Sequence, residues 1–239
     1  MNQIATRLKD LKLLGMSQEY QNLQEAKILH KLGFTEGMEK LIEAEMIDRK
    51  LKRFERLKTS ARFRYQSSLE ELKVENARGL NKEILSQLAS CDFVTKGESV
   101  IITGPTGSGK SYLASALGHQ ACVMGKSVAY YNMAKLSKKL KMVKADGSNL
   151  TFFEKLSKVA LLIIDDFCLV PMSLEQKYDL LEIIEDRHNK TSTILASQIP
   201  VKAWHQIIGE ATIADAILDR LVHTAYRIEL KGESFRKRK

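Results

Sequence analysis

Short apolar runs alternate with longer amphipathic stretches from residue 99 onward. Five runs rich in β-branched residues predict strands: "SVIITG" (99–104), "SVAYYNM" (127–133), "VALLIIDDF" (159–167), "STILASQ" (192–198) and "YRIEL" (226–230). The stretches "SYLASALGHQACVMG" and "LEQKYDLLEIIEDRHN" have the spacing of amphipathic helices. This alternation predicts an α/β fold in which helices flank a parallel sheet.

The first part of the chain has a different pattern. It contains no proline and no strand-like alternation, and its apolar residues recur at helical spacing, as at Ile4, Leu8 and Leu11. We therefore expect a small all-helical N-terminal domain over residues 1–67, followed by the α/β domain over residues 68–239. Three glycines are the expected breaks between the helices: Gly15, Gly33 and Gly37.

The composition favours a polyanionic partner. The chain carries 38 Lys and Arg against 29 Asp and Glu, a formal charge of +9. Nucleic acid is the first candidate, while a membrane surface or plain solubility are alternative explanations. No apolar run approaches the roughly 20 residues that span a bilayer, and the first residues lack the pattern of a signal peptide. We expect a cytoplasmic protein without a membrane partner.

The three cysteines do not indicate a disulfide framework or a zinc site. Cys91, Cys122 and Cys168 are odd in number, lie far apart and have no clustered histidines. We expect buried, reduced thiols.

The motif "GPTGSGKS" lies between a predicted strand and a predicted helix and fits G-x-x-x-x-G-K-[ST]. Its glycines turn backbone N–H groups toward phosphate oxygens, Lys110 supplies charge for the β- and γ-phosphates, and Ser111 offers a hydroxyl to Mg²⁺. The N-terminus of the following helix favours the same anion. We therefore predict that ATP and Mg²⁺ are bound by the motif and the tyrosine after it: Gly104, Pro105, Thr106, Gly107, Ser108, Gly109, Lys110, Ser111 and Tyr112.

Polar residues end two of the predicted strands. The run "VALLIIDDF" ends in two acids at the edge where open α/β sheets bind ligands. We predict that Asp165 binds Mg²⁺ and that Asp166 acts as a base or positions the attacking water; capping of the next loop is the alternative. The run "STILASQ" ends in Ser197 and Gln198. The Gln198 amide is placed to contact the γ-phosphate or the water, with a turn-forming role as the alternative.

Three stretches resemble IstB, the AAA+ helper ATPase family of insertion-sequence transposition, which is related to DnaC-type helicase loaders. They are "GPTGSGKSYLA", "LLIIDDFCLVP" and "ILASQIPVKAWHQIIGEATIADAILDRLVHTAYRIELKGESFRKRK". The resemblance extends from about Leu69 to the C-terminus. It implies a bacterial ATPase that assembles as a ring or helical homo-oligomer on double-stranded DNA and works with a partner transposase.

The resemblance also implies roles for single residues. Gly104 to Ser111 look like Walker A, Asp165 and Asp166 like Walker B, and Gln198 like sensor 1. Two positions depart from the AAA+ pattern. Asp166 stands where many members carry Glu, and its shorter side chain is expected to slow hydrolysis. Cys168 stands where we expect Gly.

Two arginines near the end of the chain are candidates for contact with the nucleotide. Arg220 looks like an arginine finger that acts on a neighbour's γ-phosphate, with a bridge to Asp219 or Glu210 as the alternative. Arg236 looks like a sensor 2 arginine that contacts the nucleotide, with a basic tail as the alternative. Nine residues follow "YRIEL", so we expect no C-terminal lid and a nucleotide covered by the next subunit.

Two basic segments are candidates for DNA contact. One follows the second predicted strand, and the other, "DRKLKRFERLKTSARFRY", has Phe54, Phe63 and Tyr65 interleaved with its cations. Solvated helix faces, with the aromatics in the core, are the alternative. The predicted contacts are Lys135, Lys138, Lys139, Lys141 and Lys144 in the first segment, and Arg49, Lys50, Lys52, Arg53 and Arg56 in the second.

These observations give three functional hypotheses. The first is an ATP-dependent, DNA-binding regulator that oligomerises on DNA, remodels it and recruits or activates a transposase, with ATP hydrolysis as the switch. The second is a helicase loader similar to DnaC. The third is a small-molecule P-loop kinase, which would need an acceptor-binding segment or lid that the sequence does not indicate.

Overall fold

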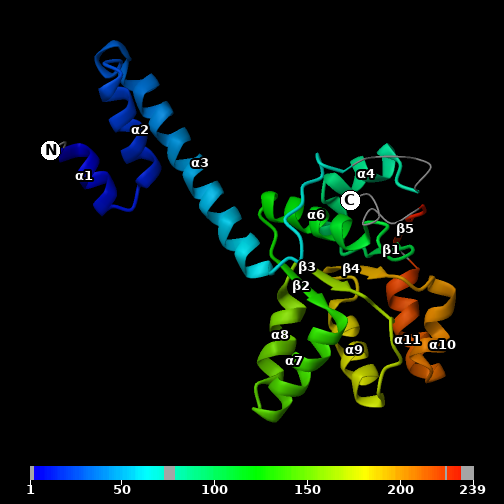
Figure 1. Cartoon of the computed structure of the whole chain (residues 1–239). Helices are drawn as coiled ribbons and strands as arrows, with labels where there is room; N and C mark the ends of the chain where they lie inside the picture. The colour runs from blue at the N-terminus through cyan, green and yellow to red at the C-terminus, as the bar shows by residue number, and fades with distance from the viewer. Residues whose placement is uncertain (1–2, 73–78, 224, 233–239) are drawn as a thin grey trace. The chain divides into compact units, whose positions relative to one another are not determined.

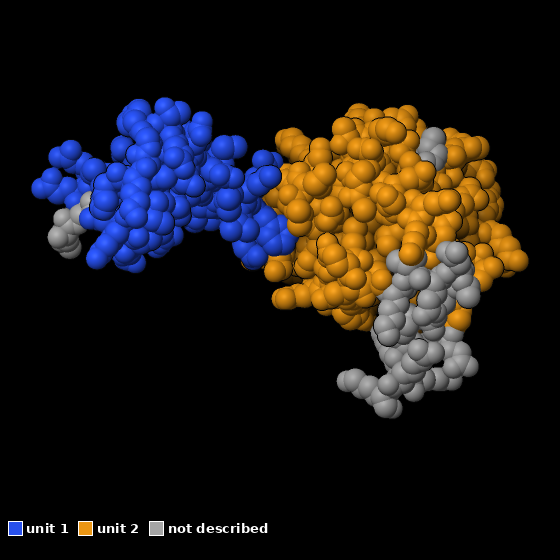
Figure 2. Space-filling model, turned by 90° about the horizontal axis from the view of Figure 1, so that it is seen from above, with its two compact units in different colours: residues 1–56 blue, residues 57–239 orange. Residues whose placement is uncertain are grey.

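The computed structural model describes residues 3–72, 79–223 and 225–232. The chain divides into two compact units, residues 1–56 and residues 57–239 (Figure 2). The division falls inside a helix that runs over Phe34–Ala61. Residues 57–67, which the sequence analysis grouped with the N-terminal helices, therefore belong to the second unit by their contacts.

The first unit is helical, as predicted. It contains α1 (Gln3–Asp10), α2 (Leu14–Glu25), the short 3₁₀ helix η1 (Leu29–Lys31) and the larger part of α3 (Phe34–Ala61). Several apolar residues of this unit remain exposed on the described chain, including Leu11, Phe34 and Met46. Helical periodicity therefore identified the helices here better than it identified buried positions.

Of the three glycines predicted as breaks between helices, Gly33 lies between two helices, whereas Gly15 and Gly37 lie within α2 and α3. Gly15 lies inside α2, where a Cβ atom would come within 2.4 Å of the Ala44 carbonyl oxygen on α3. Its backbone N–H donates to the Glu45 carboxylate over 2.9 Å. Gly15 thus allows α2 to pack closely on α3. Gly33 does precede α3, but Gly37 lies within it, so the break predicted at Gly37 is wrong.

The second unit is built on a five-stranded parallel sheet, and all five predicted strands are confirmed. In the described residues the strands are β1 (Val100–Thr103), β2 (Val128–Asn132), β3 (Leu161–Asp165), β4 (Ser192–Ser197) and β5 (Tyr226–Glu229), in the order β2-β3-β4-β1-β5. β3 and β4 are buried along their whole length. Central strands of a parallel sheet are covered on both faces, which explains their continuous apolar sequences.

Helices cover both faces of the sheet. Figure 1 shows α6 (Lys110–Val123) with α4 (Lys82–Ala89) on one face; the short α5 (Asp92–Lys96) precedes β1. The other face carries α7 (Met133–Ala145), α8 (Asn149–Lys158), α9 (Leu174–Arg187), α10 (Trp204–Ile208), which follows η3 (Val201–Ala203), and α11 (Ala211–Val222). Among the described residues, no helix is long and apolar enough to cross a membrane.

The core beneath α7 to α11 includes the single tryptophan. The Trp204 ring packs edge-on against Phe167, with the ring centres 4.8 Å apart, and both side chains are fully buried. The Trp204 indole N–H donates to the Ile199 carbonyl over 2.9 Å. Buried indole groups need such a partner, so this contact fixes the ring in the core. Phe167 directly follows Asp166, and the core therefore supports the loop after β3.

The register of the sheet aligns the ends of its strands. Asp165 lies opposite Asn132 of β2 on one side and Ala196 of β4 on the other, while Thr103 of β1 lies opposite Ser197. The carboxyl ends of β1, β3 and β4 thus meet at one edge, where ligands bind in open parallel sheets.

Candidate nucleotide site

The loop between β1 and α6 needs its glycines. Gly104, Gly107 and Gly109 all have positive φ angles, of 149°, 81° and 101°. A Cβ atom at Gly104 would come within 2.3 Å of the Leu230 carbonyl oxygen. Side chains at these positions would force a different backbone path, so the phosphate-binding conformation depends on glycine.

Two polar side chains of this loop fit a triphosphate. Lys110 is 6% exposed, and its ammonium donates to the Pro105 carbonyl over 2.8 Å. The Ser108 hydroxyl lines the cavity beside the loop, is buried, and has no hydrogen-bond partner among the described residues. A buried hydroxyl without a partner is unfavourable. A phosphate oxygen would satisfy this hydroxyl and accept from Lys110.

The cavity beside the loop has the size and lining that a nucleotide needs. Its volume is about 540 Å³, within the range of small-molecule sites. The loop residues from Thr106 to Tyr112 form a polar side, and five leucines contribute apolar surface elsewhere in the lining: Leu72, Leu80, Leu113, Leu169 and Leu230. The polar side suits phosphates, and the apolar surface suits a base.

Residues 62–72, which we call the connecting segment, form part of the cavity wall beside Tyr112. The Ser67 hydroxyl donates to the Tyr112 carbonyl over 3.2 Å, and the Tyr65 and Tyr112 rings lie 6.2 Å apart between centres. The Tyr112 hydroxyl donates to Glu71 over 2.6 Å, and this hydrogen bond raises the pKa of Tyr112. Tyr112 therefore lies at the cavity, where the sequence analysis placed it, and is held from two sides.

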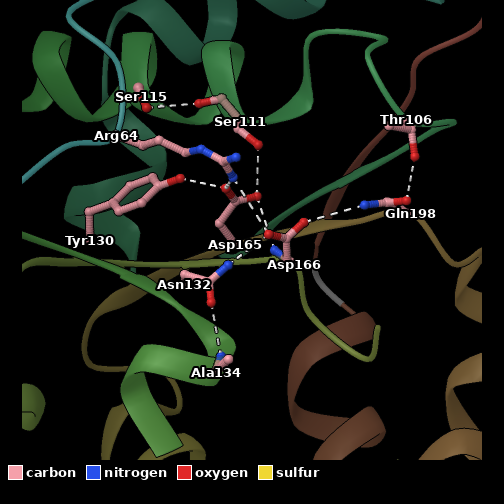
Figure 3. A network of polar contacts seen from close by, with 10 residues as sticks. All are labelled: Arg64, Thr106, Ser111, Ser115, Tyr130, Asn132, Ala134, Asp165, Asp166 and Gln198. Carbon is pink, nitrogen blue, oxygen red and sulfur yellow. Dashed lines mark hydrogen bonds and ion pairs between the residues drawn. The ribbon is translucent and has the colours of Figure 1, made fainter. Parts of the chain in front are cut away.

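Asp165 ends β3 and is fully buried. Its Oδ1 atom accepts from the Ser111 hydroxyl over 3.0 Å, and its Oδ2 atom accepts from the Tyr130 hydroxyl over 2.5 Å (Figure 3). Burial, together with the hydrogen bond to Asp165, raises the pKa of Tyr130, which therefore stays a neutral donor. A serine hydroxyl beside a fixed carboxylate is the oxygen pair that Mg²⁺ needs in a P-loop site. The two predicted metal ligands are thus in contact.

Asp166 is held by side chains from two other strand ends. The Asn132 amide donates to its Oδ2 atom over 2.7 Å, and the Gln198 amide approaches its Oδ1 atom at 3.5 Å (Figure 3). Gln198 also accepts from the Thr106 hydroxyl of the phosphate loop over 2.5 Å. The structure therefore brings Asp166 and Gln198 together beside the loop, as expected for residues that act on the γ-phosphate or its attacking water.

The backbone after β3 is unusual at two residues. Asp166 and Cys168 have positive φ angles of 56° and 54°, which non-glycine residues seldom adopt. The angle at Cys168 explains why glycine is expected at that position. Burial raises the pKa of the Cys168 thiol to about 12, so it stays protonated. Cys91 and Cys122 are buried free thiols as well, as predicted.

Three residues of the site were not predicted from the sequence. Tyr130 and Asn132 belong to β2, and Arg64 belongs to the connecting segment, where its Nη1 atom lies 3.3 Å from Asp165 Oδ2 and 3.5 Å from Asp166 Oδ2. Asn132 ends a predicted strand, so its position at the sheet edge was a usable signal. Arg64 gave no separate signal because it lies within a run of basic residues.

Of the two arginines predicted to contact ATP, the structure describes only Arg220. Arg220 lies on α11, and its Nη2 atom forms an ion pair of 2.8 Å with Glu185 on α9. This acid differs from Asp219 and Glu210, the partners that the sequence analysis considered. Among the described residues, those that line the nucleotide cavity do not include Arg220. Arg236 lies outside the described residues.

The lysines of α7 divide into two groups. Four are exposed and lie away from the apolar residues that pack α7 on the sheet: Lys135, Lys138, Lys139 and Lys141. Lys144 instead contacts α9, with ion pairs of 2.5 Å to Asp179 and 3.0 Å to Glu175. The hydrogen bond to Asp179 raises the pKa of Lys144. Lys144 therefore connects two helices in addition to any role toward DNA.

The second basic segment lies on α3 and the residues after it. All five of its predicted DNA contacts are exposed, and two of them, Arg49 and Lys52, form ion pairs one helical turn apart, with Glu45 and Asp48. The aromatic residues after α3 face inward in the second unit. Phe63 packs against His119, with ring centres 4.4 Å apart, and Tyr65 lies beside Tyr112. Both side chains are partly buried, and these contacts favour the packing alternative.

The sheet order, the phosphate loop and the acids after β3 define a P-loop nucleotide-binding protein of the AAA+ class. Solved structures support this class at the level of the fold. A crystal structure of the DnaC helicase loader is 19% identical with a TM-score of 0.57, covering 70% of this chain and 98% of that one. DnaA from Aquifex aeolicus bound to AMPPCP is 17% identical with a TM-score of 0.60, covering 72% and 52%.

Sequence comparison identifies the family within this class. The model of the IstB-like ATP binding protein family matches residues 6–239, and the chain belongs to this family. A Sinorhizobium fredii protein named as an insertion sequence ATP-binding protein, y4pL, is 41% identical over 97% of this chain and 94% of its own length. The corresponding protein named for insertion sequence IS21 of Pseudomonas aeruginosa is 29% identical over 99% and 89%. The match thus includes most of the N-terminal helices, beyond the start at Leu69 inferred from the motifs.

Proposed function

We propose that this protein is an ATP-hydrolysing regulator of insertion-sequence transposition that oligomerises on double-stranded DNA and recruits or activates a partner transposase. The observation that carries the proposal is the contact of Ser111 with Asp165 beside the phosphate loop, with Asp166 and Gln198 next to it. This arrangement suits hydrolysis of a terminal phosphate. The insertion-sequence names of the relatives favour transposition over helicase loading or phosphorylation of a small molecule.

Each side chain has a distinct part in the proposed hydrolysis. Lys110 and the loop N–H groups bind the phosphates. Mg²⁺, held by Ser111 and Asp165, would neutralise charge on the β- and γ-phosphates. Asp166 orients the attacking water, and the Asn132 amide holds the Asp166 carboxylate in one orientation. Gln198, fixed by the Thr106 hydroxyl, contacts the γ-phosphate or the water. The site therefore acts mainly by positioning its substrate.

Positive surfaces on both units support the proposed binding of DNA. The exposed lysines of α7 form one surface, and the exposed cations of α3 form another. Clustered cations bind the DNA backbone because they release counterions from the phosphates, which needs no particular base sequence. We therefore propose that contacts to DNA are mostly independent of sequence, and that any target preference comes from the shape of the DNA or from the transposase.

An oligomer would complete the nucleotide site. Among the described residues, the arginine that lines the cavity is Arg64, which pairs with Asp165 and Asp166, while the Arg220 side chain on α11 is 28% exposed. We propose that Arg220 reaches the γ-phosphate of a neighbouring subunit and stabilises the charge of the transition state there. Hydrolysis would then depend on assembly, and ATP would act as an assembly switch.

Measurements on wild-type protein and Lys110→Ala test this proposal. The wild-type protein should bind ATP, form oligomers on double-stranded DNA with ATP, and hydrolyse ATP faster when DNA is present. Lys110→Ala should lose tight ATP binding and ATP-dependent assembly, because it lacks the charge that binds the phosphates. Lys155→Ala, which removes an exposed lysine of α8, is the matched control and should behave like wild type.

The partner is tested separately. The transposase encoded with this protein should be retained on DNA carrying the wild-type oligomer and not on DNA incubated with Lys110→Ala. Assembly of Lys110→Ala equal to that of wild type would contradict the ATP switch. Retention of a replicative helicase in place of the transposase would favour the loader hypothesis.

A further inference from the structure

Arg64 makes a contact that the proposed hydrolysis does not use. Its guanidinium lies within 3.5 Å of both acids that follow one another at the end of β3, 3.3 Å from Asp165 and 3.5 Å from Asp166 (Figure 3). These acids are the predicted metal ligand and the predicted water-positioning residue. Arg64 also lines the nucleotide cavity together with the phosphate loop. A cation is thus present where the proposed reaction needs Mg²⁺.

The surroundings of Arg64 indicate an exchangeable contact. The Arg64 side chain is 41% exposed, whereas the Asp165 side chain is 1% exposed. Asp165 also accepts from Ser111 and Tyr130, so its position does not depend on Arg64 alone. Water solvates the Arg64 guanidinium when it leaves the pair, and a divalent ion compensates the buried Asp165 carboxylate in its place. The carboxylates would remain in place.

We infer that Arg64 is a positioning residue of the nucleotide site, which offsets part of the negative charge of Asp165 and Asp166 while the metal is absent and leaves this pair when ATP and Mg²⁺ bind. The inference rests on the proposed binding of ATP with Mg²⁺. Two neighbouring carboxylates repel each other, and a nearby cation relieves the repulsion. A divalent ion at Ser111 and Asp165 supplies that charge instead and repels the guanidinium.

The exchange would connect the metal site to the cavity wall. Arg64 belongs to the connecting segment, which holds Tyr112 through Ser67 and Glu71. The same segment follows directly on α3, which ends at Ala61. Release of Arg64 would loosen one attachment of this segment while its contacts to Tyr112 remain. Occupancy of the metal site would therefore change the restraint on the residues that follow α3.

The test compares nucleotide binding with and without metal in the full-length protein. The dissociation constant of a fluorescent N-methylanthraniloyl-ATP is measured in EDTA and in excess Mg²⁺, and the ratio of the two constants gives the gain in affinity due to the metal. In Arg64→Gln this ratio should rise about fivefold, since the metal no longer competes with a guanidinium; the factor corresponds to about 1 kcal/mol. The measurement needs no catalytic turnover.

Two further variants test whether the change in the ratio comes from the position of Arg64 or from the loss of one positive charge. Arg62→Gln removes the same charge at an exposed residue of the same segment and should keep the wild-type ratio. Arg64→Lys keeps the charge and should stay within about twofold of wild type, as expected for a solvent-accessible pair. Circular dichroism checks that each variant folds.

The outcomes distinguish the inference from the proposed function. Wild-type protein that binds no nucleotide in either buffer would contradict the proposed function itself. Tight binding with the same ratio in wild type, Arg64→Gln and Arg64→Lys would overturn the inference alone. A rise in Arg62→Gln as large as that in Arg64→Gln would also overturn it, because the effect would then come from net charge.

Discussion

The Asn132 side-chain amide donates a hydrogen bond of 2.7 Å to the Asp166 carboxylate across the ends of two neighbouring strands. The Asn132 side-chain oxygen Oδ1 accepts from the backbone N–H of Ala134 over 3.1 Å, which fixes the direction of the side-chain amide. Asn132 therefore caps α7 and orients Asp166 at the same time. The hydrogen bond from Asn132 to Asp166 matters because the Asp166 side chain is shorter than the glutamate of many AAA+ proteins. A shorter side chain leaves its carboxylate less freedom to move toward the attacking water.

Asp166→Asn should leave ATP bound and reduce kcat by about 100-fold or more, the usual contribution of a general base. The assembly on DNA should persist longer, because ATP is not consumed. Asn132→Ala should have a smaller effect on kcat, since the carboxylate is still present but less well oriented. Single-turnover hydrolysis and nucleotide binding measure the two effects. A wild-type rate in Asp166→Asn would mean that another residue positions the water.

Replacing Lys138, Lys139 and Lys141 together by Ala should weaken binding to all DNA sequences. The slope of log K against log salt should fall by up to about 0.9 for each phosphate that the variant no longer neutralises. Fluorescence anisotropy with two unrelated duplexes at several salt concentrations measures both quantities. A variant with the same reduction of charge at exposed lysines outside α7, Lys155, Lys190 and Lys202 to Ala, is the control. An unchanged slope in the α7 variant would mean that this helix face is only solvated.

Arg220→Ala should bind ATP normally but lose DNA-stimulated hydrolysis, by about 10³-fold if the arginine acts as a finger. Mixing Arg220→Ala with Lys110→Ala should restore partial activity, because the mixed interfaces join a bound ATP to an intact arginine. Glu185→Gln breaks the 2.8 Å ion pair but keeps the arginine, and it should retain hydrolysis. If Glu185→Gln fails as Arg220→Ala does, and the mixture shows no recovery despite co-assembly, the ion pair within the subunit is the important contact.

Gly118→Ala should destabilise the second unit by about 1–3 kcal/mol, the usual cost of overpacking. A Cβ atom at Gly118 would lie 2.4 Å from Cε1 of Phe63 and 2.8 Å from Cδ1 of Ile163. Gly37→Ala is the control, because Gly37 is also helical and has no atom within 4 Å of its Cβ position. It should be neutral or stabilising by up to about 1 kcal/mol, the gain in helix propensity. Denaturant unfolding followed by circular dichroism measures both changes, and adding Phe63→Leu to Gly118→Ala should recover stability.

The strands and the phosphate loop were predictable because local sequence determines them. Continuous β-branched runs are typical of buried parallel strands, and glycines at fixed spacing before a helix define the phosphate loop. Asp165, Asp166 and Gln198 were predictable for a related reason, since polar residues at the ends of such strands point to the binding edge.

The missing parts of the site depend on which segments become neighbours. Tyr130 and Asn132 contact the acids because β2 pairs with β3 in one register, with Asn132 opposite Asp165. Periodicity does not determine the order of strands. Arg64 contacts Asp165 across 101 residues of sequence, and nothing within the basic run separates it from its neighbours. The ion pair of Arg220 with Glu185 likewise follows from the packing of α11 on α9.

The packing of Trp204 on Phe167 gives the protein an internal spectroscopic label. The sequence contains one tryptophan, so all indole emission comes from this ring. Phe167 directly follows Asp166, and a shift of the loop after β3 on nucleotide binding would change the surroundings of the indole. The wavelength and intensity of tryptophan emission would then follow the nucleotide state in stopped-flow mixing of unlabelled wild-type protein, and they would separate binding from hydrolysis in time.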